Sequence, residues 1–240
     1  GGVDHISDAP IQFPKKMRKK LFLAQKLKGL VGGIKFLSRL RLSDFIPERP
    51  AIAEYTTNKS MGADCDIMAA RFGIPRAEQD AYAMRSHQMA AEAQKKGFLT
   101  EEMVSVKLPP KFKGIESDNG IRENSKIDKL AQLRPAFDKK FGTLTAANSS
   151  FLTDGASAVL LMSEEKAKRL GFIAKAEIVD FTFTGQRLED ELLLGPAYAV
   201  LKLLDRQKMT FKDIDVIEFH EAFAGQILSN LKALASDGFA

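Results

Sequence analysis

Cysteine is nearly absent from this chain, since one residue, Cys65, occurs among 240. A single cysteine excludes an intrachain disulfide and fits a reducing compartment. No grouping of cysteine and histidine has the spacing of zinc ligands, so no metal site is predicted. Tryptophan is missing altogether. No uncharged apolar run approaches the roughly 18 residues that a membrane-spanning helix needs.

An amino-terminal signal is also missing. The chain opens with Gly1-Gly2-Val3-Asp4, which has neither an initiator methionine nor the apolar core of a signal peptide. Both ends resemble the interior of a protein, and we therefore expect the chain to be a fragment. Its composition, 45% hydrophobic and 28% charged, is that of a globular protein with one large domain or two small ones.

The positive charge is concentrated in one segment. The formal net charge is +5, from 36 Lys and Arg against 31 Asp and Glu. Ten basic residues and no acidic residue lie between Lys15 and Arg41, so the rest of the chain holds 26 basic against 31 acidic residues and is net acidic. Nucleic-acid-binding domains spread basic residues over one face and add aromatic platforms, of which this segment has only Phe22 and Phe36. No nucleic-acid partner is therefore predicted.

Hydrophobic spacing and capping signals predict helices. Apolar residues three or four apart over 15–42, interrupted by glycines, predict two basic amphipathic helices. Another helix follows Pro75 and ends before Gly97, with Glu78 in its first turn, which suits the helix dipole. Further helices are expected over 61–72, 163–171, 196–207 and 222–235.

Short runs of apolar and β-branched residues predict strands. After about residue 150 these runs alternate with the expected helices, which favours an α/β layered architecture with parallel strand pairing. The runs are Ala156–Met162, Ala176–Phe183 and Val216–Phe219, and Met103–Leu108 is expected to form an earlier strand.

His220 follows the expected strand at Val216–Phe219 and directly precedes an expected helix. Ligands of open α/β sheets bind at the carboxyl ends of strands, where an imidazole can order a water or donate to an oxyanion. A histidine that only satisfies backbone groups at the junction explains the same position, and the residues alone leave both interpretations open. The segment is not the zinc motif H-E-x-x-H, because its fifth residue is Ala224.

The segment Thr145–Ser150 is rich in small and polar residues. Small residues permit the close approach of a ligand, and Asn148 and Ser150 supply adaptable hydrogen bonds. From the residues alone, a tight loop that leads into a strand is the favoured interpretation.

Four blocks of this sequence, in order, resemble the thiolase family. They are GGVDHISDAP (1–10), MGADCDIMAARFGIPRAEQDAYAMRSHQMAAEAQKKG (61–97), RPAFDKKFGTLTAANSSFLTDGASAVLLMSEEKAKRLG (134–171) and DIDVIEFHEAFAGQ (213–226). The last block matches the family's N-E-A-F motif with histidine in place of asparagine. That histidine and the basic insertion are similar to a mitochondrial, membrane-associated subfamily that acts on long-chain substrates.

The resemblance implies roles for matching residues. His220 would order the oxyanion-hole water that faces the acetyl-CoA enolate, and Glu221 would support its turn. The resemblance assigns a CoA or substrate contact to Arg122 at the nucleotide end, Ala146 and Ser150 at the pantetheine arm, Met61 in the acyl pocket, and Ala222. The residue before Met61 is commonly histidine in the family but is Ser60 here. Coenzyme A is a substrate, and no cofactor is implied.

The resemblance also implies that the catalytic thiols are elsewhere. Thiolases use a nucleophilic cysteine, an activating histidine and a second cysteine, which would precede residue 1 or follow residue 240. Cys65 matches no catalytic position and is expected to be a buried apolar side chain. His87, within a polar helix, is expected to be solvated. We therefore expect the chain by itself to be inactive.

The basic insertion at 15–42 has three interpretations: a helix on an anionic membrane surface, a docking element for a partner subunit, and a solvated cover. The membrane is favoured because the basic excess is unrelieved by acidic residues. The residues expected at the membrane are Lys15, Lys16, Lys19 and Lys20.

Together these observations predict an incomplete layered αβαβα fold of the thiolase type. Residues 1–172 would form part of the N-terminal half, with an inserted loop region at about 10–148, and 173–240 would begin the C-terminal half. The expected activity is thiolytic cleavage of 3-ketoacyl-CoA by CoA in fatty-acid β-oxidation. The resemblance implies a homodimer, a hetero-oligomer with a hydratase/dehydrogenase α subunit, and a place on the matrix side of the mitochondrial inner membrane. A non-catalytic membrane-surface or scaffold module is the alternative.

Overall fold

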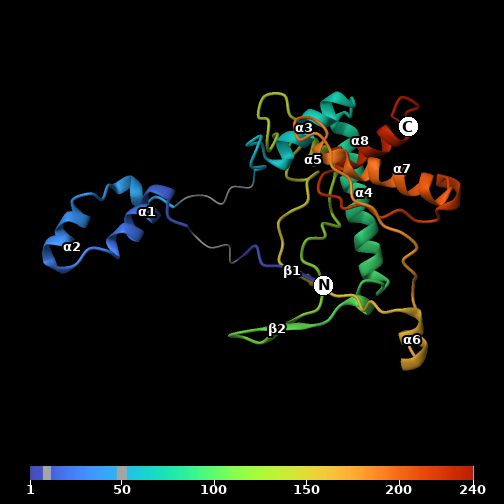
Figure 1. Ribbon diagram of the computed structural model, residues 1–240. Helices are drawn as coiled ribbons and strands as arrows, with labels where there is room; N and C mark the ends of the chain where they lie inside the picture. Colours follow the sequence, from blue (N-terminus) through green and yellow to red (C-terminus); the bar gives the residue numbers. More distant parts are fainter. Residues whose placement is uncertain (8–11, 48–52, 240) are drawn as a thin grey trace. The chain divides into compact units, whose positions relative to one another are not determined.

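The computed structural model describes residues 1–7, 12–47 and 53–239 (Figure 1). The chain forms two compact units, one of Gly1–Ile52 with Leu152–Met162 and one of Ala53–Phe151 with Ser163–Ala240. The expected start of the inserted region near residue 10 lies outside the described residues.

The first unit joins a small sheet and a basic helical segment. Strand β1 (Gly2–Asp4) pairs antiparallel with β4 (Gly155–Ser157), placing Val3 opposite Ala156. The basic segment folds into α1 (Lys15–Ala24), α2 (Gly29–Leu37) and the 3-10 turn η1 (Leu42–Phe45). The prediction that glycine divides this segment is confirmed, because α2 begins at Gly29 with φ +71°, a conformation that favours glycine.

Most of the regular secondary structure of the second unit is helical, and long irregular segments join its helices. Helix α4 is its longest element and appears as the long green helix of Figure 1. The α-helices of this unit are α3 (Met61–Arg71), α4 (Arg76–Lys95), α5 (Ile127–Ala131), α6 (Glu164–Leu170), α7 (Gly195–Gln207) and α8 (Ala224–Leu234). Its 3-10 turns are η2 (Thr100–Glu102), η3 (Leu192–Leu194) and η4 (Phe211–Asp213).

Local signals place several helix ends where the sequence predicts them. Pro75 is the N-cap of α4, Lys95 lies in its last turn, and the chain leaves it through Gly97 at φ +81°. Helix α6 begins after Ser163, whose hydroxyl accepts from the Lys166 backbone N–H at 3.3 Å, and ends at Gly171 in the left-handed region. Helix α6 thus follows the usual rules of capping at both ends, and α4 follows them at its C-terminal end.

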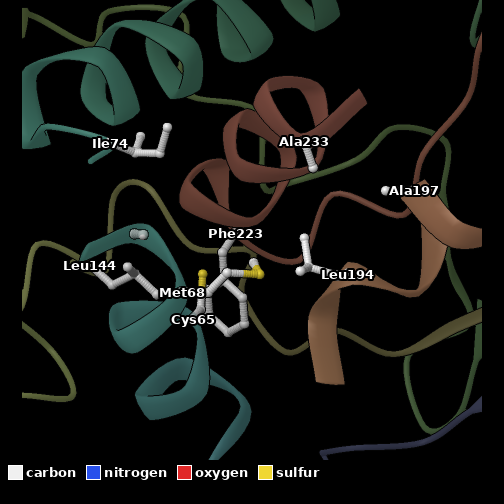
Figure 2. Close-up of a cluster of buried hydrophobic side chains, with 9 residues drawn as sticks. Cys65, Met68, Ile74, Leu144, Leu194, Ala197, Phe223 and Ala233 are labelled. Atoms are coloured by element: carbon white, nitrogen blue, oxygen red, sulfur yellow. The ribbon is translucent and has the colours of Figure 1, made fainter. Parts of the chain in front are cut away.

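The core of the second unit lies where α3, α8 and η3 meet. Figure 2 shows Met68 and Cys65 of α3 in the same apolar cluster as Phe223, at the start of α8, and Leu194 of η3. The other buried members of the cluster are Ala69, Ile74, Leu144, Ala197 and Ala233.

Two of the expected strands are not formed, and a third is formed only at its start. Of Ala156–Met162, only the first two residues belong to a strand, and Ala176–Phe183 and Val216–Phe219 contain none. Their side chains remain exposed: Val159 is 76% and Val179 77% accessible. Strand propensity describes how a residue fits a pleated, half-buried surface. Without hydrogen-bonded neighbours these apolar runs have no such surface, so the strands predicted at Ala176–Phe183 and Val216–Phe219 were wrong, and the one at Ala156–Met162 is confirmed only in its first two residues.

The pairing direction was also wrong for the described residues, whose two small sheets are both antiparallel. Besides β1–β4, strand β2 (Val106–Leu108) pairs with β3 (Lys113–Ile115), so the expected strand at Met103–Leu108 is confirmed only in its second half. The β2–β3 hairpin closes locally and needs no crossover, whereas β1 and β4 pair although they lie far apart in the chain. Within 1–7, 12–47 and 53–239, no helix is long and apolar enough to cross a membrane.

Candidate functional site

The loop between residues 143 and 150 is held by hydrogen bonds among its own residues. The side chain of Asn148 is buried, accepts from the Thr145 backbone N–H at 2.7 Å and donates to the Thr143 carbonyl at 3.1 Å. Ala146 and Ser150 of the same loop are exposed. The loop therefore presents small, accessible residues on a backbone whose interior hydrogen bonds are satisfied.

Helix α3 supplies a second fixing point for this loop. One carboxylate oxygen of Asp66 accepts from the backbone N–H groups of Thr143, at 2.8 Å, and Leu144, at 3.0 Å. Its other oxygen accepts from the Asp138 N–H at 3.1 Å. Hydrogen bonds to a carboxylate are stronger than neutral ones, so Asp66 ties the start of the loop to α3.

The segment before α8 lies antiparallel to the end of this loop. The Ser150 N–H donates to the Ala222 carbonyl at 2.8 Å, and the Ala224 N–H donates to the Asn148 carbonyl at 3.0 Å. Between them, Phe223 is buried and packs edge-to-face on Phe137, with ring centroids 5.7 Å apart. Two segments singled out from the sequence are thus brought together, at Ser150 and Ala222.

His220 and Glu221 precede this paired segment and are exposed. The prediction that His220 lies between a strand and a helix was wrong, because no strand forms at Val216–Phe219 and α8 begins only at Ala224. The side chain of Glu221 instead accepts a hydrogen bond from the hydroxyl of Tyr82 on α4. Side-chain and backbone contacts, rather than the end of a sheet, therefore position this turn.

Arg122 lies beside α4. Its backbone N–H donates to Nδ1 of His87 at 3.3 Å, while its side chain is exposed. The expectation that His87 is simply solvated was wrong, because the ring is partly buried and accepts a hydrogen bond. Burial, and secondarily the positive charge of Arg122, lower the pKa of His87.

Met61 opens α3, is partly buried and packs against the apolar core cluster. The preceding residue, Ser60, is the N-cap of this helix; the family that the sequence resembles commonly has histidine there. Its hydroxyl accepts from the Ala63 N–H at 3.2 Å. Serine is among the best residues for that role, so the position serves the helix.

Cys65 has none of its surface exposed and belongs to the apolar cluster, as expected. Burial, together with the neighbouring charge of Asp66, raises the pKa of its thiol far above the usual range. A thiol nucleophile needs a lowered pKa and access to substrate, and Cys65 has neither.

The basic segment has one lysine that is already paired. Lys20 is partly buried, forms an ion pair with Asp44 at 2.5 Å and donates to the Arg39 carbonyl at 2.6 Å. It therefore ties α1 to η1 within the first unit, and its place at a membrane surface stays a prediction. Lys15, Lys16 and Lys19 are exposed.

Several polar contacts of the site had no sequence signal. Tyr82 and Glu221 are 139 residues apart, and Asp80 and Asn148 are 68 apart.

Among the described residues, no group of three or more His, Cys, Asp or Glu could hold a metal ion.

Helices α3 and α4 thus hold the small-residue loop next to the segment that carries His220 and Glu221. The thiolase N-terminal domain matches residues 1–165, and the thiolase C-terminal domain matches residues 172–238. The chain belongs to the thiolase family.

Its curated relatives include the mitochondrial trifunctional enzyme subunit beta of Bos taurus, 51% identical over 240 residues, and a 3-ketoacyl-CoA thiolase of Yersinia pestis, 47% identical over the same length. Each match covers all of this chain, together with 50% of the Bos taurus protein and 55% of the Yersinia pestis protein. The chain therefore spans about half the length of the curated relatives it matches.

A solved structure with the same fold is the acetyl-CoA acetyltransferase of Bacillus anthracis. The TM-score is 0.79 at 29% identity, and the match covers 99% of this chain and 56% of that one. The expected fold class is confirmed by this likeness, although the strand pairings predicted for these residues were not.

Proposed function

We propose that the protein containing this chain is a 3-ketoacyl-CoA thiolase of fatty-acid β-oxidation. Family membership and relatives named 3-ketoacyl-CoA thiolase and trifunctional enzyme subunit beta support this proposal. The reaction converts 3-ketoacyl-CoA and CoA to acetyl-CoA and a shortened acyl-CoA, with no other reactant.

In the proposed reaction, a cysteine thiolate attacks the 3-keto carbonyl. The bond between the α- and β-carbons breaks, and its electron pair remains on the acetyl-CoA enolate, which a second acid protonates. The thiol of CoA then attacks the acyl-enzyme thioester and releases the shortened acyl-CoA. Because Cys65 is buried and protonated, we assign the attacking thiolate to a cysteine outside these residues.

His220 is proposed to stabilise the enolate oxygen through a water molecule. The observation that carries this assignment is the backbone pairing of Ser150 with Ala222, which joins the turn after His220 to the small-residue loop. An oxyanion donor is effective when it is fixed before charge develops. In this proposal Ala146 and Ser150 contact the pantetheine arm, Ala222 and Met61 the acyl end, and the Arg122 guanidinium the nucleotide phosphates.

His220→Ala in the product of the complete open reading frame tests this assignment. Loss of an oxyanion donor costs about 10²–10³-fold in kcat, with KM for CoA little changed. Thiolysis of acetoacetyl-CoA is followed by consumption of the substrate. His5→Ala, outside the assigned site, is the control. Equal kcat for H220A and H5A would contradict the proposed role.

The location proposed for the enzyme is the matrix side of the mitochondrial inner membrane, with the basic segment on the lipid surface. The mitochondrial name of the relatives supports the compartment. The first unit supports the surface contact, because α1 presents basic and apolar side chains together on an exposed surface. Those residues are Lys15, Arg18, Lys19, Phe22 and Leu23. Such a mixture suits an anionic headgroup above acyl chains.

Co-sedimentation with cardiolipin-containing vesicles tests the membrane contact. The variant changes Lys15, Lys16 and Lys19 to Glu, and a matched control changes the exposed Lys107, Lys111 and Lys113 of the β2–β3 hairpin. The first variant should lose binding at physiological salt, while the control retains it. Equal binding by both would contradict the proposal.

We also propose that the protein forms a thiolase homodimer that binds a hydratase/dehydrogenase α subunit. The proposal is supported by a relative that is named as a subunit of a trifunctional enzyme. Copurification with that subunit, measured by mass photometry of the complete protein, tests this arrangement. A protein that remains alone in the presence of the subunit would contradict it.

A further inference from the structure

Tyr82 connects α4 to the turn that carries His220. Its hydroxyl donates to a carboxylate oxygen of Glu221, the residue next to His220. Burial, and secondarily this carboxylate, raise the pKa of Tyr82, so the hydroxyl remains a donor at neutral pH. A hydrogen bond from a hydroxyl to a carboxylate is one of the stronger kinds in proteins.

The backbone on the other side of Glu221 is fixed independently. The Ala222 carbonyl accepts from the Ser150 N–H, and the following Phe223 side chain is buried against Phe137. Glu221 therefore lies between a backbone contact to the loop and a side-chain contact to α4. Its exposed position gives the carboxylate freedom to rotate, which the bond from Tyr82 removes.

The helix that carries Tyr82 is itself tied to the loop. Two residues before Tyr82, the buried Asp80 accepts from the Asn148 side chain at 3.0 Å. Arg76, four residues before Asp80, forms an ion pair with it at 2.7 Å and donates to the Leu133 carbonyl at 3.2 Å. One helix thus fixes both the loop and the turn, and Tyr82 is its contact to the turn.

We propose that Tyr82 is a positioning residue for the oxyanion-stabilising histidine, acting through Glu221 to fix the turn at His220. The inference rests on the proposed function of His220. Tyr82 does not itself contact the reacting atoms in this account. Its loss should therefore lower the rate of the chemical step and leave CoA binding unchanged.

Tyr82→Phe in the complete protein tests the inference, because it removes one hydroxyl and keeps the ring. We expect kcat for thiolysis to fall about tenfold, the value of one hydrogen bond to a charged group, with KM for CoA within twofold. Tyr198→Phe is the matched control, because that hydroxyl also donates to a glutamate, Glu191 at 3.0 Å, outside the assigned site. Thermal midpoints of the two variants exclude a general loss of folding.

A double-mutant cycle shows whether Tyr82 acts through its partner. Glu221→Ala and the double variant with Tyr82→Phe should have the same kcat, because the hydroxyl no longer has its acceptor. Additive losses, a rise in KM with unchanged kcat, or a Y82F enzyme equal to Y198F would overturn the inference. A fully active H220A enzyme is a different outcome, and it would contradict the proposed function of His220.

Discussion

Asn148 donates a hydrogen bond from its side-chain nitrogen to Asp80 at 3.0 Å, and both side chains are buried. The contact joins the loop at 143–150 to α4. Because α4 also contacts Glu221 and the backbone of Arg122, one helix positions three segments to which the family resemblance assigns substrate contacts.

Asn148→Ala should destabilise the protein by about 2 kcal/mol, because it leaves a buried backbone N–H at Thr145 and a buried carboxylate oxygen at Asp80 without partners. The measurement is chemical denaturation of the complete protein, with the exposed Asn124→Ala as control. The same variant should raise KM for CoA, since Ala146 and Ser150 lie on this loop. Equal stability of the two variants would remove the structural role given to Asn148.

Gly62→Ala should destabilise α3, although alanine favours helices. A Cβ at this position would lie 2.3 Å from the ring of Phe137, which packs on Phe223. Overpacking of this kind costs about 1–3 kcal/mol. Gly33→Ala is the control, since nothing lies within 4 Å of its Cβ, and it should be neutral or stabilising. Thermal denaturation that ranks the two variants in the opposite order would contradict the packing described here.

His87 should make stability depend on pH. Its pKa is lower in the folded protein than in the unfolded chain, so the unfolded chain binds more protons and stability falls as the pH drops below the usual histidine value. Protonation also removes the ring acceptor for the Arg122 N–H. His87→Gln keeps an acceptor without titrating.

The measurement is the free energy of unfolding of wild type and H87Q between about pH 7.5 and about pH 5.5. Wild type should lose more stability than H87Q over this interval. Parallel curves for the two proteins would show that His87 does not titrate as described.

Local signals in the sequence predict most helices and few of the strands. Pro75 and Gly97 bracket α4, and Ser163 and Gly171 bracket α6, because capping depends on neighbouring residues. A strand depends on a partner that can be distant, and Val216–Phe219 has none among the described residues. Propensity therefore predicts the apolar character of that segment and not its hydrogen bonding.

In the candidate site, too, local motifs can be predicted from the sequence and long-range contacts cannot. The motifs at 145–150 and 220–223 can be recognised in the sequence, and the family resemblance relates them. The residues that position them, Tyr82, Asp80 and Asp66, lie far away in sequence within the family-like block 61–97, and the resemblance assigned them no role. Only the tertiary structure brings these side chains to the loop and the turn.

Identification of the acylated residue by mass spectrometry tests directly whether the nucleophilic thiol lies outside residues 1–240. The complete protein is incubated with acetoacetyl-CoA, quenched in acid and digested, and the acetylated cysteine is located. We predict a thioester on a cysteine outside residues 1–240, with Cys65 unmodified because its thiol is buried and its pKa is raised. An acetyl group on Cys65, with activity abolished by Cys65→Ala, would contradict the account.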